Sequence, residues 1–222
     1  MNTAEKIRTH IESQIAKGEH ILQMPYLIGI SGKAGAGKSE TTRFLREIHR
    51  YKQCSFAARL KTACSELFGL DEKYYSSHKS EPIPGFEVVT ARELYQFFGT
   101  ELCRTLFGPH FFVWNEASYN KTAMLHKNSR VVYDDVRFQE EADWILECGG
   151  TLIHLTRKGA DGKVGIPDHA SEQGYQTTDT KLYRKGENYY EIENNGTVFD
   201  LGYQINKVLA AVRLAQTSLK SI

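Results

Sequence analysis

The residues with the clearest chemistry form one unbroken run that fits the pattern GxxxxGK[ST] at every fixed position. Its glycines let successive backbone N–H groups converge on a polyphosphate, and the helix expected to follow adds the positive end of its dipole. The lysine offers a mobile charge for the β and γ phosphates, and the serine hydroxyl suits Mg²⁺, which prefers oxygen ligands. We therefore expect ATP with Mg²⁺ to bind at Gly32, Lys33, Ala34, Gly35, Ala36, Gly37, Lys38 and Ser39, with Glu40 beside them.

A pair of acidic residues supplies the partner that such a loop needs for its metal ion. Asp134 and Asp135 come at the end of the strand expected over 130–135. In a parallel α/β sheet, ligands bind at the carboxyl ends of the strands, so the pair should lie beside the phosphate loop. Because successive strand residues point to opposite faces, only one carboxylate is expected to serve the metal directly. Turn formation and helix capping are the alternative for the pair.

The elements that must position these residues alternate between strand and helix patterns. The apolar run at 25–31 ends in the glycines and precedes a helical pattern, which gives a strand, a loop and a helix. Further strands are expected at 53–57, 130–135, 151–156 and 189–193, with helices at 59–68, 91–106, 111–127, 138–148 and 198–214. This alternation predicts an α/β fold, a P-loop NTPase three-layer sandwich whose five-stranded, mostly parallel sheet has helices on both faces.

Length and composition favour one folded domain with an appended subregion. The chain has 222 residues, 41% of them hydrophobic and 25% charged, which argues against a disordered or fibrous protein. Its 28 Lys and Arg nearly cancel its 27 Asp and Glu, so neither nucleic acid nor a membrane is expected as a partner. The charged N-terminus and the short apolar stretches predict no signal peptide and no transmembrane span, which makes the cytoplasm the expected location.

Other classes of protein fit the sequence less well. The 4 cysteines stand far apart with no CxxC, and the 8 histidines show no ligand spacing, so neither a disulfide framework nor a zinc site is expected. A GTPase or motor reading lacks an N-K-x-D signature and a second phosphate loop, and the chain is too short for an AAA-type ATPase. A small phosphotransferase remains.

Two polar stretches interrupt the alternation of strands and helices. Residues 71–90 are broken by Pro and Gly, and residues 158–188 contain several glycines. Long stretches without regular structure inside a compact domain are commonly lids or binding loops. Both stretches are therefore candidates for closing over a ligand.

Five runs of sequence carry a family resemblance, namely GKAGAGKSETTRFL, FAARLKTACSELFGL, RELYQFFGTELCRTLFGPHFFVWNEA, VVYDDVRFQEEADWILECGGTLIHLTRKG and HASEQGY. Over about residues 26–205 the chain resembles the phage-type deoxynucleoside monophosphate kinases. The N-terminal helix, expected at about 3–18, lies outside this likeness. The resemblance implies a single kinase domain over 1–222, with an acceptor-binding region at about 58–128 and a lid at about 157–188.

The resemblance also implies an activity. The γ-phosphoryl group of ATP would pass to a (deoxy)nucleoside 5′-monophosphate, with Mg²⁺ as cofactor, small-molecule nucleotides as partners and the host cytoplasm as location for a phage-borne chain. Two alternatives stay open: a P-loop kinase for another small metabolite, such as dephospho-coenzyme A or a sugar acid, and a nucleotide-dependent regulatory ATPase. The sequence leaves open which bases are accepted, whether deoxyribose is required and whether the chain forms a homodimer.

The acceptor nucleotide is expected on the helix at 91–106. Residues at every fourth position share a helix face, so an amide able to bond a base edge would sit beside phosphate-binding guanidinium groups. A solvated arginine face is the alternative. The family's R…Q…GT…R segment matches Arg92, Gln96, Gly99, Thr100 and Arg104.

Three further acceptor residues follow from the resemblance. Arg59 and Lys61 match a basic helix start that would hold the acceptor phosphate, although exposed basic helix starts are equally common. Trp114 matches an aromatic residue that would wall the base pocket, and a core tryptophan is the alternative.

The D-x-R match at Asp135 and Arg137 implies an acid and a base between the donor and acceptor phosphates. It favours Asp135 over Asp134 for Mg²⁺ or its water shell. Arg157 would be a lid arginine and, with Lys38 and Arg137, a catalytic cation. The H-x-S-E match has no assigned role and comprises His169, Ser171 and Glu172.

Overall fold

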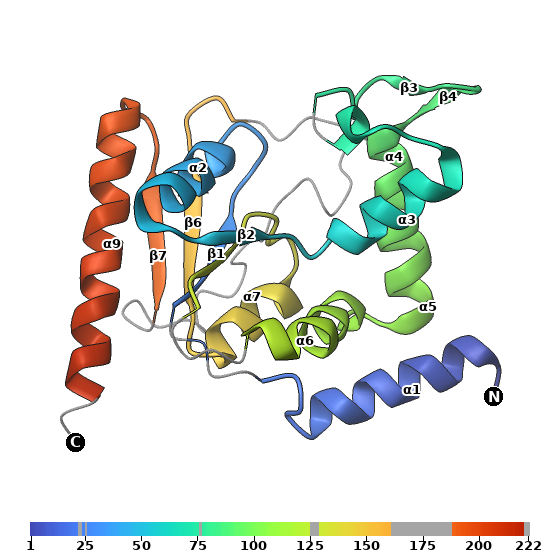
Figure 1. Cartoon of the computed structure of the whole chain (residues 1–222), viewed down its shortest axis with the longest axis horizontal. Coiled ribbons are helices and arrows are strands. Elements are labelled where there is room, and N and C mark those ends of the chain that lie inside the picture. Colours follow the sequence, from blue (N-terminus) through green and yellow to red (C-terminus); the bar gives the residue numbers. More distant parts are fainter. Residues whose placement is uncertain (22–23, 25, 76, 125–128, 161–187, 220–222) are drawn as a thin grey trace.

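Five parallel strands form the central sheet. The computed structural model describes residues 1–21, 24, 26–75, 77–124, 129–160 and 188–219 (Figure 1). In chain order the strands are β1 (Leu27–Ser31), β2 (Lys52–Cys54), β5 (Val131–Tyr133), β6 (Thr151–Thr156) and β7 (Tyr189–Glu193). Their order across the sheet is β2-β5-β1-β6-β7, and each neighbouring pair is parallel. Every carboxyl end therefore lies at the same edge, with β1 at the centre.

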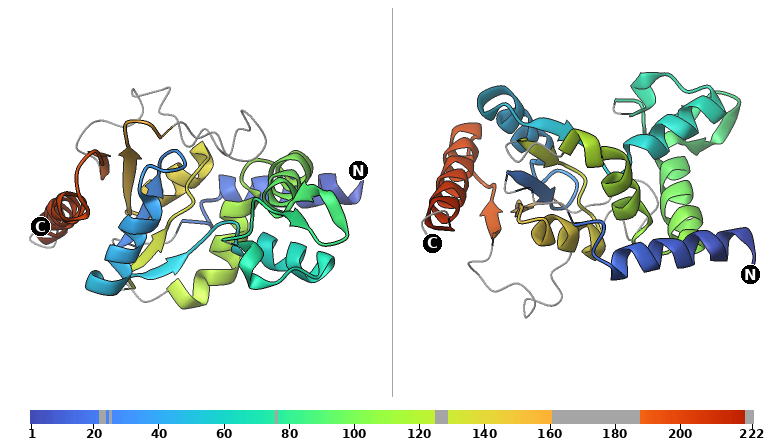
Figure 2. Two further views of the ribbon diagram at one scale, coloured as in Figure 1. Left: turned by 90° about the horizontal axis from the view of Figure 1, so that it is seen from above. Right: turned by 60° about the horizontal axis from the view of Figure 1, so that its bottom comes forward.

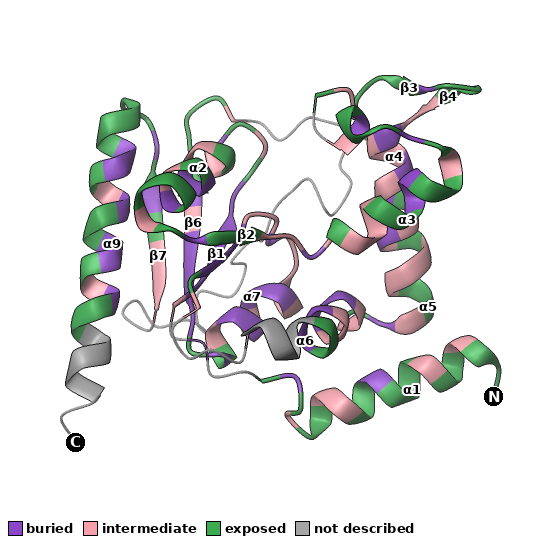
Figure 3. Cartoon of the chain, viewed as in Figure 1, coloured by how far each residue is buried: buried purple, intermediate pink, exposed green. Residues whose placement is uncertain are grey.

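One face of the sheet is covered by α2 (Lys38–His49) and α9 (Val198–Leu219). Apolar side chains of β1, β6 and β7 pack there against Leu45 of α2 and against Leu201, Ile205 and Leu209 of α9. The buried positions of α9 line the side that faces the sheet in Figure 3.

The opposite face is covered by α6 (Phe111–Met124) and α7 (Gln139–Glu147). Trp144 and Ile145 of α7 pack with Phe112 and Val113 of α6 against Leu27, Val131 and Leu152 of the strands. Strands that are apolar on both faces require cover on both faces. The result is a three-layer α/β sandwich, as the alternation of patterns predicted.

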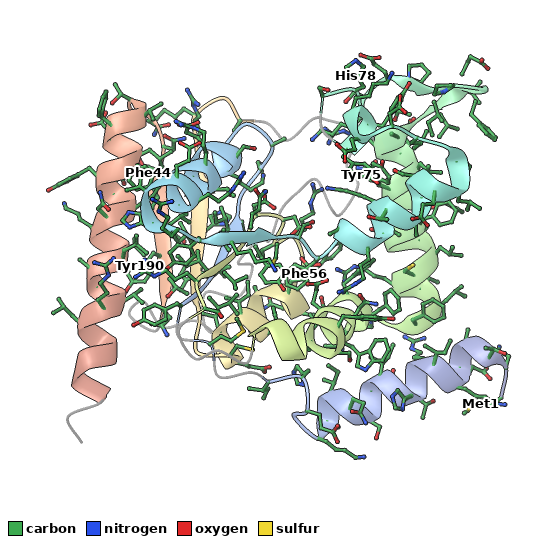
Figure 4. The ribbon with its side chains drawn as sticks, viewed as in Figure 1. Met1, Phe44, Phe56, Tyr75, His78 and Tyr190 are labelled. Atoms are coloured by element: carbon green, nitrogen blue, oxygen red, sulfur yellow. The ribbon has the colours of Figure 1, made fainter. Side chains whose placement is uncertain are left out.

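A smaller group of elements stands beyond the β2 edge of the sheet. It consists of α3 (Ala58–Phe68), the 3₁₀ helix η1 (Glu72–Tyr75), the antiparallel hairpin β3 (Pro82–Ile83) and β4 (Phe86–Thr90), and α4 (Ala91–Gln96). Cys64, Tyr74, Ile83 and Leu94 form its own small core. Figure 4 labels Tyr75 and His78 in this group, and Phe56 where the chain enters α3.

A continuous helical stretch runs from α4 through the π-helical segment η2 (Phe97–Arg104) into α5 (Thr105–Phe107). The N-terminal helix α1 (Thr3–Ala16) packs against α5 and α6 and buries Ile11. In the views of Figure 2, α1 and α9 lie at opposite ends of the molecule. Among the described residues, no helix combines the length and the apolar character needed to cross a bilayer.

Most expected elements are observed, some with shifted ends. The strands at 151–156 and 189–193 have the expected bounds, and the strand expected at 130–135 is confirmed but shorter. The strand expected at 53–57 is shorter as well, because residues 55–57 leave the sheet to bond Asp135. The stretch 71–90 is not structureless: it contains η1 and the β3–β4 hairpin.

Packing around Gly29 in β1 generates a test of the core. A Cβ at this position would lie 2.3 Å from Ile145 Cδ1 and 3.1 Å from Leu152 Cδ1. Gly29→Ala should therefore lower the free energy of unfolding by about 1–3 kcal/mol, the usual cost of overpacking. The double variant Gly29→Ala/Ile145→Val removes the clashing methyl and should be more stable than the sum of the two single changes. Chemical denaturation measures the free energy of unfolding of all three variants. If the effects of the two single changes simply add, the contact between Ile145 and position 29 does not cause the loss of stability.

Candidate active site

The loop between β1 and α2 has the backbone of a phosphate cradle. Gly32, Gly35 and Gly37 adopt φ values of +134°, +83° and +105°, which residues with side chains rarely adopt. These turns bring the chain from the carboxyl end of β1 to the first turn of α2 at Lys38. The N-terminal N–H groups of α2 therefore open at the same edge of the sheet as the loop.

Two neighbouring segments fix the loop from behind. A Cβ on Gly32 would lie 2.3 Å from the Leu155 carbonyl oxygen, and one on Gly37 would lie 2.2 Å from Asn194 Nδ2. Asn194, directly after β7, donates from Nδ2 to the Ala36 carbonyl oxygen at 3.0 Å. The glycines thus serve close packing against β6 and β7 as well as the phosphate-binding conformation.

The Lys38 ammonium folds back over this loop. Nζ donates to the carbonyl oxygens of Gly32 at 2.5 Å and Lys33 at 2.9 Å. Behind it, Ser31 Oγ lies 2.9 Å from His154 Nδ1. Burial lowers the pKa of His154; the Glu191 carboxylate opposes this, and the Lys38 ammonium adds to it. The imidazole therefore remains neutral at neutral pH and adds no second positive charge beneath Lys38.

Two pockets open at this edge of the sheet and share part of their walls. The first is lined by the phosphate loop with Ser39 and Glu40. The second lies between α3, the α4–η2 stretch and the start of α7, and encloses about 750 Å³ with its open mouth included. Three cationic side chains line both pockets: Lys79, Arg92 and Arg137.

The π-helical segment keeps an every-fourth-residue stripe on the second pocket. An α-helix turns about 100° per residue, so three steps of four residues would drift by about 120°. The wider turns of η2 reduce that drift. Gly99 also lets η2 approach α3, since a Cβ there would lie 3.0 Å from Leu60 Cδ2. All of the stripe lines the pocket: Arg92, Gln96, Gly99, Thr100 and Arg104.

Arg104, which is expected to serve the acceptor, lines the second pocket and also bonds within the protein. Its Nη2 donates to Glu141 Oε1, its Nη1 donates to the Pro109 carbonyl oxygen at 2.7 Å, and its guanidinium lies 3.7 Å from the ring centroid of Phe138. Glu141 Oε2 accepts from the backbone N–H of Arg137 at 2.8 Å and of Phe138 at 3.2 Å. Burial raises the pKa of Glu141 to about 7, against the opposing effect of Arg104. Arg104 is therefore part of the pocket wall.

The two aspartates after β5 have different partners. Asp135 accepts from Ser55 Oγ at 2.6 Å and from the N–H groups of Phe56 at 3.0 Å and Ala57 at 3.1 Å, and it lines the second pocket. Asp134 accepts from Gln53 Nε2 at 2.6 Å. In the described part of the chain, no three His, Cys, Asp or Glu side chains gather as a metal site. Mg²⁺ that is held largely by substrate phosphates needs only one or two protein carboxylates, so it does not require such a cluster.

Two expected acceptor residues lie elsewhere. Arg59 points to α6, where its Nη1 donates to Asn115 Oδ1 and Glu116 Oε1, both at 3.0 Å. Trp114 packs on α1, with its ring edge-to-face on His10 at a centroid distance of 6.2 Å. Neither is among the residues that line the two pockets, and their roles toward the acceptor stay predictions; in the structure Arg59 links α3 to α6, and Trp114 packs on α1.

The remaining expected residues divide by position. Lys61 lines the second pocket. Arg157 is exposed just after β6, and most of the expected lid follows it. The lid positions 161–187, with His169, Ser171 and Glu172, lie outside the described residues.

Sequence reasoning missed two residues that the fold brings to the site. Glu141 stands four residues after Arg137 in the third position of α7, where an acidic side chain is a familiar capping signal. Lys79 lies in the polar stretch 71–90, which was singled out only as a whole. No local pattern distinguishes Lys79 from other exposed lysines.

The buried position of Asp134 beside Asp135 predicts how the stability of the protein changes with pH. Burial, together with the Asp135 charge, raises the pKa of Asp134 to about 6, against the opposing effects of Lys61 and Gln53. Because the folded pKa exceeds the unfolded value, stability falls as pH rises from about 4 to about 6. Asp134→Asn removes this cost and should raise the free energy of unfolding by about 1–2 kcal/mol at pH 8, with little change at pH 4.

Asp200 provides a control, because its pKa is shifted in the opposite direction to that of Asp134. Hydrogen bonds from the Thr197 N–H and hydroxyl lower the pKa of Asp200. Asp200→Asn should therefore lose stability at pH 8 relative to pH 4. Denaturant titrations at both pH values compare the variants, and an Asp134→Asn protein that is less stable at pH 8 would contradict the assignment.

Comparison with known proteins yields one relative of clear significance. No family model matches the chain. The chain is similar to a protein of Acanthamoeba polyphaga mimivirus named "Putative deoxynucleotide monophosphate kinase". The two are 36% identical over 148 residues, which cover 60% of this chain and 75% of the viral protein. With the phosphate loop, the α/β sheet and the second pocket in place, this similarity shows that the chain belongs to the deoxynucleotide monophosphate kinase family.

Proposed function

We propose that this protein transfers the γ-phosphoryl group of ATP to a (deoxy)nucleoside 5′-monophosphate, giving ADP and the nucleoside diphosphate. The observation that carries the proposal is the shared wall of the two pockets. Lys79, Arg92 and Arg137 line both the phosphate-loop pocket and the second pocket. A phosphoryl group that passes from a donor to an acceptor must cross such a boundary.

The donor side fits ATP with Mg²⁺. The loop 32–37 and the start of α2 present backbone N–H groups, and Lys38 can swing from the loop carbonyls to the β and γ phosphates. Ser39, which lines this pocket, and Asp135, which lines the second pocket, would hold Mg²⁺, with Asp134 the less direct candidate. When bound, Mg²⁺ would neutralise charge on the β and γ phosphate oxygens.

The acceptor side fits a nucleoside monophosphate. Gln96 is only 6% exposed, yet its amide lines the pocket, where it can pair with the edge of a base. Aromatic rings line the same pocket and can cover the faces of the base. Lys61 and Arg92 line it as well and suit a phosphate.

The mechanism needs positioning and charge neutralisation rather than a covalent intermediate. An oxygen of the acceptor phosphate attacks the γ-phosphorus, and the bond to the β-phosphate oxygen breaks with its electron pair left on ADP. Arg137, held by Glu141 through its backbone N–H, remains at the point of transfer as charge moves. Arg157, which directly follows β6, would be a further cation for this step.

Two other functions give different products. A kinase for dephospho-coenzyme A or a sugar acid would phosphorylate that acceptor instead. A regulatory ATPase would release free phosphate alone. Incubation with ATP, Mg²⁺ and each nucleoside monophosphate in turn, followed by ion-exchange chromatography, distinguishes the three outcomes; a nucleoside diphosphate supports the proposal.

Lys38→Ala should abolish most of this activity. Its ammonium acts chiefly on charge in the transition state, so we expect kcat to fall by about 10³-fold or more while the unfolding transition is preserved. Lys207→Ala is the matched control, since Lys207 is an exposed lysine of α9 far from both pockets. Steady-state kinetics of both variants make the comparison; wild-type turnover in Lys38→Ala would refute the proposed function.

Gln96→Ala should act on the acceptor alone. Loss of one base hydrogen bond costs about 1–3 kcal/mol, so the KM for the preferred nucleoside monophosphate should rise by about tenfold or more, and the enzyme should discriminate less between bases. The affinity for ATP, measured by calorimetry, is the internal control and should stay unchanged. An equal effect on ATP binding would place Gln96 at the donor site instead.

A further inference from the structure

Lys79 occupies the boundary between the two pockets but comes from neither the phosphate loop nor the helices around the acceptor pocket. It belongs to the turn at 77–80, between η1 and the β3–β4 hairpin. Its side chain lines the phosphate-loop pocket and the acceptor pocket alike. The upper group of elements in Figure 4, which contains this turn, thus reaches toward the phosphate loop.

The backbone at Lys79 is fixed to the first turn of α4. The Lys79 carbonyl oxygen accepts from the Arg92 N–H at 2.7 Å. Thr90 and Glu93 close a reciprocal capping box at the start of α4, with Thr90 N donating to Glu93 Oε2 at 2.8 Å. Lys79 and Arg92 are therefore held side by side by a direct main-chain bond.

The hairpin after the turn is fixed as well. Ile83 of β3 is 1% exposed and packs with Tyr74 and Leu94. The His78 N–H donates to the Lys73 carbonyl oxygen, and the Glu81 N–H donates to the His78 carbonyl oxygen, both at 2.9 Å. Main-chain hydrogen bonds thus hold the turn on both sides of Lys79, which fixes the position of its backbone.

The charge of this boundary suits a polyanion. Lys38, Lys79, Arg92 and Arg137 all line the phosphate-loop pocket, against Glu40 as its acidic residue, and Glu40 is paired with Arg43. Cations placed close together repel one another, and a bound polyphosphate relieves that repulsion. A cation at the border of the two pockets can attract phosphates on both sides, so its interaction with them is strongest when both pockets are occupied.

We propose that Lys79 is a catalytic residue that contacts the phosphoryl group in transit between the donor and the acceptor, an inference that rests on the proposed kinase reaction. Its ammonium keeps its protons throughout and donates hydrogen bonds to oxygens of the γ-phosphate and of the acceptor phosphate. The acceptor oxygen forms the new bond to phosphorus as the bond to ADP breaks. Lys79 thereby offsets the repulsion between the two anions as they approach.

Kinetics and binding of Lys79→Met test this role. We expect kcat to fall by about 10²-fold or more, and Lys79→Arg, which keeps the charge, to recover much of the loss. The binding probes are ATP alone, each nucleoside monophosphate alone, and pentaphosphates that link adenosine to a second nucleoside and so fill both pockets. By calorimetry, the affinity of Lys79→Met for the tightest of these linked pentaphosphates should fall by about 10- to 100-fold, and more than its affinity for either single nucleotide.

Lys73→Met is the matched control. Lys73 lies in the same segment, pairs with Asp71 at 3.4 Å and lines neither pocket, so this variant should bind and turn over as the wild type does. Equal binding of the linked pentaphosphate by Lys79→Met and wild type would overturn the proposal, as would an equal loss in Lys73→Met. The binding titration needs no turnover, so it tests the role of Lys79 independently of the kinase reaction. A wild-type protein that makes no nucleoside diphosphate would refute the kinase reaction itself.

Discussion

The buried carboxylate of Glu141 connects the helical segment η2 to the start of α7. One oxygen accepts from Arg104 of η2, and the other accepts from the backbone N–H groups of Arg137 and Phe138 at the start of α7. The removal of one partner from a buried ion pair costs about 3–5 kcal/mol, because the other charge is left uncompensated. The helical segment η2 and the loop that carries Arg137 are therefore positioned by the same carboxyl group.

Asp135 makes a second connection of the same kind. Its carboxylate accepts from Ser55, Phe56 and Ala57, and so ties the end of β5 to the chain that enters α3. Glu141 and Asp135 both line the acceptor pocket, where their negative charges have defined protein partners. Lysines and arginines also line this pocket, although the whole chain has a net charge of only +1. In the proposed reaction these side chains would face the phosphates.

The phosphate loop and the small group of elements beyond β2 are held by different forces. Close packing holds the loop: Gly32 lies against the Leu155 carbonyl, and Gly37 lies against Asn194. Main-chain bonds, a capping box and a few buried side chains hold the hairpin and α4. The donor pocket is therefore built on the rigid sheet, whereas part of the acceptor pocket rests on a smaller core. That arrangement suits an enzyme whose acceptor must enter and whose product must leave.

The sequence by itself determined the features that depend on neighbouring residues. The phosphate loop is encoded in eight consecutive positions. The strand at 151–156 is a run rich in apolar and β-branched residues, and the strand at 189–193 is a short run with two tyrosines and an isoleucine. Helical spacing predicted that Arg92, Gln96 and Thr100 share a face, whereas the wider turns of η2, which the spacing did not predict, keep Arg104 on the same pocket. Tertiary structure decided where long side chains point. Arg59 turns to Glu116 and Trp114 to α1, because partners distant in sequence contact them there. It also decided the place of Lys79, since the packing of a short, mostly exposed hairpin against α4 brings that lysine to the phosphate-loop pocket.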